Sequence, residues 1–276
     1  LSLGMERHKK EFLDGLIEVL RERQLAVSCV YERNDVKIRE LEGMQQYKGF
    51  YRSPLLDPAA EKTRVDIVEN GIRYTVDVEN GQKTGFFLDQ KFNRLAAAQI
   101  GKGRHVLDCF THTGAFALNI AKGGAASVTA LDISKEAAEM TAHNAKQNGL
   151  AVEAVEADVF DFLTELDKKK DHSYDYIVLD PPAFTKSGKT VHEAFRGYKE
   201  INYRAMKILP RGGYLATCSC SHFMGEELFV KMVKEAARDA GVTLRQIEFR
   251  QQAPDHPILM TVPETYYLKF FLFQIV

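Results

Sequence analysis

The chain has 276 residues, 45% of them hydrophobic and 27% charged, with a formal net charge of −1 and four cysteines. This size suits one large domain or a large domain with a small one, and the near-neutral charge argues against a general nucleic-acid coat without excluding a local basic groove. No apolar run approaches the ~18 residues of a membrane span, and no signal pattern opens the chain, so we expect a cytoplasmic protein with no membrane partner. The four cysteines are too few and too unevenly spaced for a disulfide framework, so we expect reduced thiols.

The first part of the chain, residues 1–80, is predicted to be a small α+β module. Apolar residues at helical spacing predict a helix over 6–24. Short strand-like stretches follow at 26–31, 36–41, 64–69 and 72–78. The sequence ENG between the last two is typical of a hairpin turn.

The remainder, residues 81–276, alternates between strand and helix patterns from residue 105 onward. Strands are predicted at 105–108, 127–132, 152–157, 174–180 and 213–218, and helices at 115–122, 135–148, 159–166, 192–209 and 223–240. Such alternation predicts a parallel sheet with helices on both faces. The closing stretches 242–249 and 266–275 have only a hairpin-like connection, which predicts one antiparallel strand in an otherwise parallel, seven-stranded α/β sheet.

The sequence VLDCFTHTGAF (106–116) reads as a buried strand ending in Asp108, a polar loop, and Gly114 at the start of a helix. Ligands bind at this edge of open α/β sheets. The loop has one glycine where a dinucleotide site has three, so a ligand without a pyrophosphate is favoured. The carboxylate of Asp108 suits a cationic or amino-bearing group.

Three further acids follow strands in the same way. Asp132 ends the second strand, where an acid can accept hydrogen bonds from ribose hydroxyls. Asp158 follows the third strand and can reach an adenine amino group, and Asp180 opens an Asp-Pro-Pro sequence after the fourth. Each acid alone is as readily a helix cap. Their order is the informative feature.

These features, with NGQKTGFFLDQKFNR (80–94), resemble class I S-adenosylmethionine-dependent methyltransferases, and more narrowly the cytosine-5 methyltransferases of bacterial large-subunit ribosomal RNA. KTGFFLDQ is shared with a guanine-N7 relative. The resemblance implies a Rossmann-like catalytic domain over 81–276, S-adenosyl-L-methionine as cofactor, and large-subunit ribosomal RNA as substrate. Because a cytosine within a helix would have to be flipped out, at a cost on the order of a few kcal/mol, bare or partly assembled RNA is favoured. It implies a cofactor pocket lined or braced by Lys83, Gly85, Phe86, Asp89, Gln90, Arg94, Asp108, Phe110, Thr113, Gly114, Ala115, Phe116, Asp132, Ile133, Asp158, Val159, Asp180 and Pro181. For 80–94 the alternative is a plain hairpin followed by a helix cap.

The sequence LATCSCSHFM (215–224) places Cys218 and Cys220 at the end of the fifth predicted strand. A disulfide is disfavoured because i and i+2 lie ~6.6 Å apart in an extended chain. Zinc needs about four ligands, and only His222 is near, so we predict no metal. Inert burial is the serious alternative to a nucleophile.

Methylation of cytosine carbon 5 requires a thiolate that adds to carbon 6, and an acid on the polar edge of the ring. Asp180 suits the second role. The family signature SCS matches Cys220 as nucleophile, whereas TCS, found in other RNA cytosine-5 enzymes, matches Cys218. We expect Cys220. Many such enzymes have a second cysteine after Pro-Pro for product release; Ala183 stands there, so the base that removes the carbon-5 proton is unidentified.

Weaker candidates have plainer alternatives. Tyr198, Lys199 and Asn202 could contact RNA or only solvate a helix, and Lys186, Lys189 and Arg196 could hold phosphates or lie on a solvated loop. Asp255 and His256 could border the base or only cap a turn. Phe184 and Phe223 could stack on a base, although an aromatic near a pocket is more often part of its wall.

Two rival functions stay open: methylation of guanine N7 or an exocyclic amine, and an inactive RNA-binding assembly protein. Members of the resembled family usually carry a further N-terminal RNA-binding domain, of the kind named for pseudouridine synthases and archaeosine transglycosylases. These 276 residues do not include it, so we expect either a trimmed sequence or recognition by the small module and the catalytic face. A homodimer is left open.

Overall fold

The computed structural model describes residues 3–185 and 187–276, so the phosphate candidate Lys186 lies outside the described residues. The α-helices are α1 (Leu3–Arg7), α2 (Lys9–Glu22), α3 (Ile38–Leu41), α4 (Lys91–Ile100), α5 (Ala115–Lys122), α6 (Lys135–Gln147), α7 (Val159–Lys169), α8 (Val191–Ile208) and α9 (Glu226–Ala240). The strands are β1 (Tyr31–Asn34), β2 (Tyr47–Phe50), β3 (Arg64–Glu69), β4 (Ile72–Asp77), β5 (His105–Cys109), β6 (Ser127–Asp132), β7 (Glu153–Glu156), β8 (Tyr176–Leu179), β9 (Tyr214–Ser219), β10 (Leu244–Arg250) and β11 (Lys269–Ile275).

The chain forms two compact units. The smaller one contains the residues up to Ile67 together with Thr75–Phe86, and the larger one contains Val68–Tyr74 and Phe87–Val276. No helix of the described residues is long and apolar enough to cross a membrane.

The smaller unit departs from the predicted elements in three places. The stretch 36–41, predicted as a strand, contains helix α3, and strand β2 was not predicted. The reason is Arg39, whose buried guanidinium donates to the Gln45 carbonyl and pairs with Glu6 at 3.2 Å. Those contacts draw the turn inward and leave the apolar residues that suggested a strand exposed. β1 begins at Tyr31, where the predicted strand 26–31 ends, and pairs antiparallel with β2.

The hairpin of β3 and β4 is confirmed, with Asn70 and Gly71 both at positive φ, as a tight two-residue turn requires. Its tip belongs to the larger unit. Asn70 Nδ2 donates to the Lys91 carbonyl at 3.1 Å and to Asn119 Oδ1 at 3.0 Å. The ammonium of Lys122 donates to both turn carbonyls, so the tip is fastened to helices α4 and α5.

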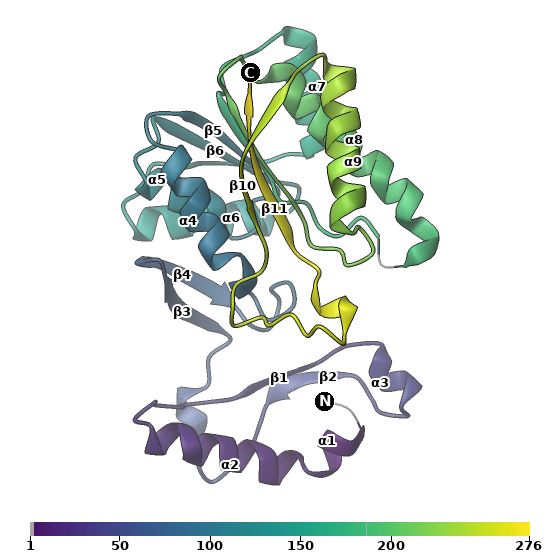
Figure 1. Ribbon diagram of the computed structural model, residues 1–276. Coiled ribbons are helices and arrows are strands. Elements are labelled where there is room, and N and C mark those ends of the chain that lie inside the picture. Colours follow the sequence, from purple (N-terminus) through teal and green to yellow (C-terminus); the bar gives the residue numbers. More distant parts are fainter. Residues whose placement is uncertain (1–2, 186) are drawn as a thin grey trace. The chain divides into compact units, whose positions relative to one another are not determined.

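The larger unit is a seven-stranded sheet in the order β10-β11-β9-β8-β5-β6-β7. All neighbours are parallel except β11, which is antiparallel to both β9 and β10, as predicted. Helices α4, α5 and α6 cover one face, and α7, α8 and α9 cover the other (Figure 1). The strand order reverses at β5, which pairs with both β6 and β8, so the ligand crevice is expected at the carboxyl ends of these strands.

Side-chain alternation divides the central strands between the two faces. Leu107, Cys109, Ile177 and Leu179 belong to the apolar cluster that packs on α7, α8 and α9. Asp108 therefore points to the opposite face, where its carboxylate meets the start of α5. By the same alternation, Cys218 faces the α4–α6 side.

Candidate active site

The loop after β5 holds a buried carboxylate with one unused oxygen. Asp108 Oδ2 accepts hydrogen bonds from Thr111 Oγ1 at 2.7 Å and from the Ala117 amide at 3.0 Å. Oδ1 is buried and has no hydrogen-bond partner among the described residues, and neither has Thr113 Oγ1. Burial raises the pKa of Asp108 to about 7, and the carboxyls of Asp180 and Asp132 add to the effect. A buried acceptor without a donor is unfavourable, so the loop is suited to a ligand that brings one.

The backbone of this loop is strained into its shape. Phe110, His112 and Gly114 all have positive φ, at 64°, 54° and 83°. A Cβ at Gly114 would lie 2.6 Å from Leu118 Cδ1 and 2.8 Å from Thr141 Cγ2, so any other residue would displace these side chains at a φ that favours glycine. Such strain persists where the surrounding structure enforces it and is common at ligand sites.

Asp132 ties the same loop to the neighbouring strand. Its Oδ2 accepts from the His112 amide at 2.9 Å, and its Oδ1 accepts from the Ser134 amide at 3.0 Å. Ile133, directly after it, is 69% exposed and could lie flat against a planar group. Asp158 is the N-cap of α7, with its Oδ1 bound to the Phe160 and Asp161 amides, so here the capping role is realised.

The carboxyl end of β8 presents a second acid, Asp180. Gln90 Nε2 donates to its Oδ1 at 3.1 Å, while Gln90 Oε1 accepts from Asn93 Nδ2 at 2.6 Å. The Asn93 contact fixes the orientation of the Gln90 amide, because that oxygen must face the Asn93 donor. Burial raises the pKa of Asp180 to about 6, against the opposing effect of the Arg94 cation.

The two cysteines of β9 have different surroundings. Cys218 is fully buried beside Asp180 and Gln90, and burial together with the Asp180 charge raises the pKa of its thiol well above the usual value. Cys220 is partly exposed, and its Sγ lies 3.9 Å from the carbonyl oxygen of Pro181, the residue after Asp180. Neither forms a disulfide. The described residues contain no group of three His, Cys, Asp or Glu side chains arranged to hold a metal ion.

Two residues near Cys220 were missed by the sequence reasoning. The Lys269 ammonium, buried at the start of β11, donates to the Ser221 carbonyl at 2.6 Å and the Tyr267 carbonyl at 2.8 Å. Tyr267 donates its hydroxyl to Asp89 Oδ2 at 2.7 Å. Lys269 could have been found from the sequence, because it opens the mainly apolar strand KFFLFQI. No sequence signal marks Tyr267.

The loop that was predicted to cover the cofactor is divided between the units. Asp89 and Gln90 are buried in the short helical turn η2 (Leu88–Gln90), and Arg94 is buried in α4, where its guanidinium pairs with Glu69 at 2.5 Å. Lys83 is exposed and Phe86 buried in the smaller unit, and their approach to the cofactor stays a prediction.

Several weaker candidates are now placed. Tyr198 and Asn202 are fully buried, so the prediction that they contact RNA is wrong. Lys199 pairs with Asp239 at 2.7 Å. Phe184 packs on Tyr198 with ring centroids 4.6 Å apart and forms part of a wall. Exposed groups that could still meet RNA are Lys189, Arg196, Phe223 and Asp255.

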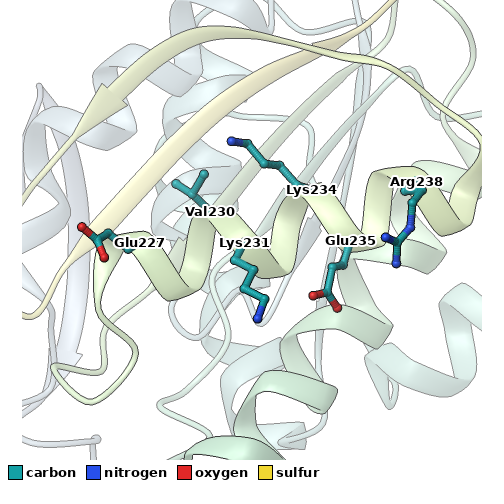
Figure 2. Close-up of a pocket in the computed structure, with 6 residues that line it drawn as sticks. All are labelled: Glu227, Val230, Lys231, Lys234, Glu235 and Arg238. Atoms are coloured by element: carbon teal, nitrogen blue, oxygen red, sulfur yellow. The ribbon is translucent and has the colours of Figure 1, made fainter.

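A separate depression runs along the surface of α9. It is lined by Glu227, Val230, Lys231, Lys234, Glu235 and Arg238, whose charged side chains fan out from that one helix (Figure 2). Charges of both signs alternate there, which is typical of a solvated helix face. None of these residues belongs to the acids and cysteines described above.

Comparison with known proteins agrees with this architecture. Residues 45–274 match the family model described as S-adenosylmethionine-dependent methyltransferase. The chain belongs to this family. It is 42% identical over 273 residues to the Ribosomal RNA large subunit methyltransferase I of Aeromonas salmonicida, and 45% identical over 259 residues to that of Shewanella amazonensis. These alignments cover 98% and 93% of the chain but 66% and 64% of the relatives, so the chain spans about two thirds of their length.

Solved structures show the same fold. A Streptococcus mutans protein described as a SAM-dependent methyltransferase superposes with a TM-score of 0.80 at 22% identity, over 98% of this chain and 66% of the other. Trm5b from Pyrococcus abyssi gives 0.66 at 18% identity, over 100% and 71%. The predicted class I methyltransferase fold and the resemblance to large-subunit ribosomal RNA methyltransferases are therefore confirmed.

The residues present fit the family's cofactor. The unused, buried Oδ1 of Asp108 can accept from the ammonium of S-adenosylmethionine. Asp132 and exposed Ile133 follow the neighbouring strand β6, and an acid at that position can accept hydrogen bonds from ribose hydroxyls. The rim lacks the repeated glycines of a pyrophosphate site, and this cofactor has no phosphate.

Proposed function

We propose that this protein transfers a methyl group from S-adenosylmethionine to carbon 5 of a cytosine in large-subunit ribosomal RNA, through a covalent adduct with Cys220. The observation that carries the proposal is the position of Cys220, partly exposed with its sulfur 3.9 Å from the carbonyl of Pro181, directly after Asp180. The relatives that match the chain carry the name of a large-subunit ribosomal RNA methyltransferase.

Cys220 is favoured over Cys218 as the nucleophile. The reactive form of a cysteine is the thiolate, and a thiolate at Cys218 would be fully buried next to the carboxyl of Asp180. Cys220 is partly exposed, so a cytosine ring lying against Pro181 could reach its sulfur. Addition of its sulfur to carbon 6 would place electron density on carbon 5, which is otherwise barely nucleophilic. After methyl transfer, loss of the carbon-5 proton to a base would break the carbon 6–sulfur bond and release the thiolate. S-adenosylmethionine, when bound, supplies an electrophilic methyl group on a sulfonium for that carbon.

Asp180 would hold the polar edge of the pyrimidine. Gln90 donates to one of its oxygens, and the Cys218 thiol also hydrogen-bonds the carboxyl. A carboxylate has about four acceptor positions, so it can bind a substrate donor in addition. As a carboxylate it accepts from the exocyclic amine of cytosine; as an acid it donates to N3. A pKa of about 6 makes both forms accessible near neutral pH and lets the group stabilise charge while the thiolate adds.

The substrate state follows from access to the ring. A cytosine within a helix would have to be flipped out, at a cost of a few kcal/mol. Bare or partly assembled ribosomal RNA, in the cytoplasm, is the form that keeps this cost low. Two further expectations belong to the same proposal: RNA contact by the module of residues 1–80, and a homodimer, which sedimentation would test.

The decisive experiment maps the methyl group. The full chain is incubated with labelled S-adenosylmethionine and protein-free ribosomal RNA, and the product is located by mass spectrometry. We expect 5-methylcytosine in the large-subunit RNA. RNA containing 5-fluorocytosine should trap a covalent complex, because fluorine cannot leave carbon 5 as a proton does. A methyl on guanine N7 or on an exocyclic amine, without a trapped complex, would replace the proposal by its rival; no transfer at all would favour an assembly role.

A further inference from the structure

Lys269 is an unusual residue for its position. It is 1% exposed at the start of β11, between the buried side chains of Leu268 and Phe270. Burial of an ammonium is costly unless other groups compensate. An apolar side chain would be enough to pack this strand, so the Lys269 ammonium is expected to interact with a polar or charged group nearby.

Its contacts lie at the segment that carries Cys220. β9 ends at Ser219, which pairs across the antiparallel ladder with Lys269. From that position the Lys269 ammonium reaches the Ser221 carbonyl at 2.6 Å, one residue past Cys220, and the Tyr267 carbonyl at 2.8 Å. An ammonium has three donors, and these carbonyls use two of them.

Ser221 is held from the other side as well. Its hydroxyl donates to the Thr185 carbonyl at 3.1 Å, in the segment that follows Asp-Pro-Pro. The backbone on either side of Cys220 is thus fixed by β9, by Lys269 and by the loop after β8. A nucleophile must be held in place in this way if its sulfur is to meet a ring atom at the correct distance.

Lys269 interacts electrostatically with acidic groups in the chain after β9. Cys220 and Glu226, at the start of α9, both act electrostatically on Lys269, and Glu226 accepts a hydrogen bond from the Tyr266 hydroxyl at 2.7 Å. Burial lowers the pKa of Lys269 to about 8, so it is still mainly protonated at pH 7.

The acidic groups that face Cys220 are mostly neutral at this pH. Burial raises the pKa values of Tyr198 on α8, Tyr267 before β11 and Cys218 on β9. Asp180, with its pKa of about 6, is mainly negative at this pH, and it precedes Pro181, whose carbonyl oxygen lies 3.9 Å from the Cys220 sulfur. Its charge would oppose a negative sulfur. A nearby cation offsets that repulsion.

We infer that Lys269 is the positioning residue of the proposed nucleophile: its ammonium clamps the Cys220–Ser221 backbone and stabilises the Cys220 thiolate. The inference rests on the proposed role of Cys220 and adds a group that would activate its thiol. A neutral donor would suffice to satisfy the Ser221 and Tyr267 carbonyls alone. A buried cation is required only if an anion forms beside it.

The test measures thiolate formation without cofactor or RNA. Iodoacetamide alkylates Cys220 in the full chain across a series of pH values, and peptide mass spectrometry follows it separately from partly exposed Cys29, which serves as the internal reference. In Lys269→Met the pH of half-maximal alkylation of Cys220 should rise by about one unit or more. The matched control Lys231→Met removes an exposed lysine from α9 and should leave the profile unchanged.

An unaltered Cys220 profile in a Lys269→Met protein that melts like the wild type would overturn the inference. If that variant does not fold, the wild-type protein decides: Cys220 must react at lower pH than Cys29, and equal or later reaction contradicts a stabilised thiolate. Alkylation involves no methyl transfer, so the two experiments fail independently. An unchanged alkylation profile would contradict the role of Lys269 without changing the mapped position of the methyl group. A methyl group found elsewhere on the RNA would contradict the proposed function without changing the alkylation profile.

Discussion

The carboxyl edge of the sheet has two halves that are built differently. The half proposed to hold the cofactor (the cofactor half) comprises the loop after β5 together with Asp132. Its shape comes from the backbone: positive φ at three positions, amide donors to carboxylates, and Gly114, where an added Cβ would lie 2.6 Å from Leu118 Cδ1. The half proposed to hold the methyl acceptor (the acceptor half) comprises Asp180, Cys220 and their partners, and its shape comes from side chains distant in sequence. Gln90 and Asp180 are 90 positions apart, and Asp89 and Tyr267 are 178 apart.

This difference has a consequence for substitution. In the cofactor half, substitutions that restrict the backbone, such as replacing a glycine at positive φ, should mainly lower cofactor affinity. In the acceptor half the loss of a single side chain should be damaging, and effects should appear in turnover while the cofactor still binds. Cofactor affinity and methyl transfer, measured on the same variants, separate the two halves.

The largest effect is expected from the nucleophile. Cys220→Ala should lower methyl transfer to ribosomal RNA by on the order of 10³-fold or more, because no other accessible thiol stands beside Asp180 in the described part of the chain. Cofactor affinity, measured by calorimetry, should stay within about threefold of the wild type. Cys218→Ala is the matched control and should retain most activity. The reverse ranking of the two variants would reassign the nucleophile to the buried cysteine.

The second effect concerns the backbone of the cofactor half. Gly114→Ala places a Cβ 2.6 Å from Leu118 Cδ1 at a φ of 83°, so we expect cofactor affinity to fall about tenfold or more. Gly212→Ala is the control, since its φ is 87° but nothing lies within 4 Å of the added atom. Equal cofactor affinities in the two variants would show that close packing of the loop on α6 is unimportant.

A smaller effect is expected from the long-range contact of the acceptor half. Tyr267→Phe removes the donor to the buried Asp89 carboxylate, a loss of about 1–3 kcal/mol if water does not replace it. Methyl transfer should fall about tenfold, with cofactor affinity little changed. Tyr266→Phe removes instead a bond to Glu226 and should have a weaker effect on turnover. A fall in cofactor affinity alone would place Asp89 in the cofactor half.

The smallest effect is on stability against pH. The pKa of Asp108 rises from 3.8 to about 7 on folding, so between these values the folded chain binds the proton more tightly than the unfolded chain. The contribution of Asp108 to the free energy of unfolding is therefore lost as pH rises from about 4 through 7. The melting temperature should decline over that range by a few degrees. Asp108→Asn should reduce the decline without abolishing it, because Asp180 titrates with the same sign. Asp255→Asn, at an exposed carboxyl, should leave it as in the wild type.

Much of this organisation was predictable from sequence, and the failures have physical causes. The hairpin and the strands of the large sheet were found because buried strands are continuous apolar runs bounded by polar turns. The smaller unit was harder, since α3 is only four residues long and depends on the inward contacts of Arg39. Tyr198 and Asn202 looked like exposed polar positions on a helix, but they face the core, where Asn202 Nδ2 bonds the Tyr198 carbonyl.

By itself, the sequence determined the α/β class, the acids at the strand ends and the presence of two cysteines at one strand tip, because local pattern places each of these on a strand or just after it. Only the tertiary structure decided which cysteine is accessible and brought Lys269, Tyr267 and Gln90 to the same edge. Burial and charge at that edge depend on how segments distant in sequence pack together, and spacing along the chain carries no record of those contacts.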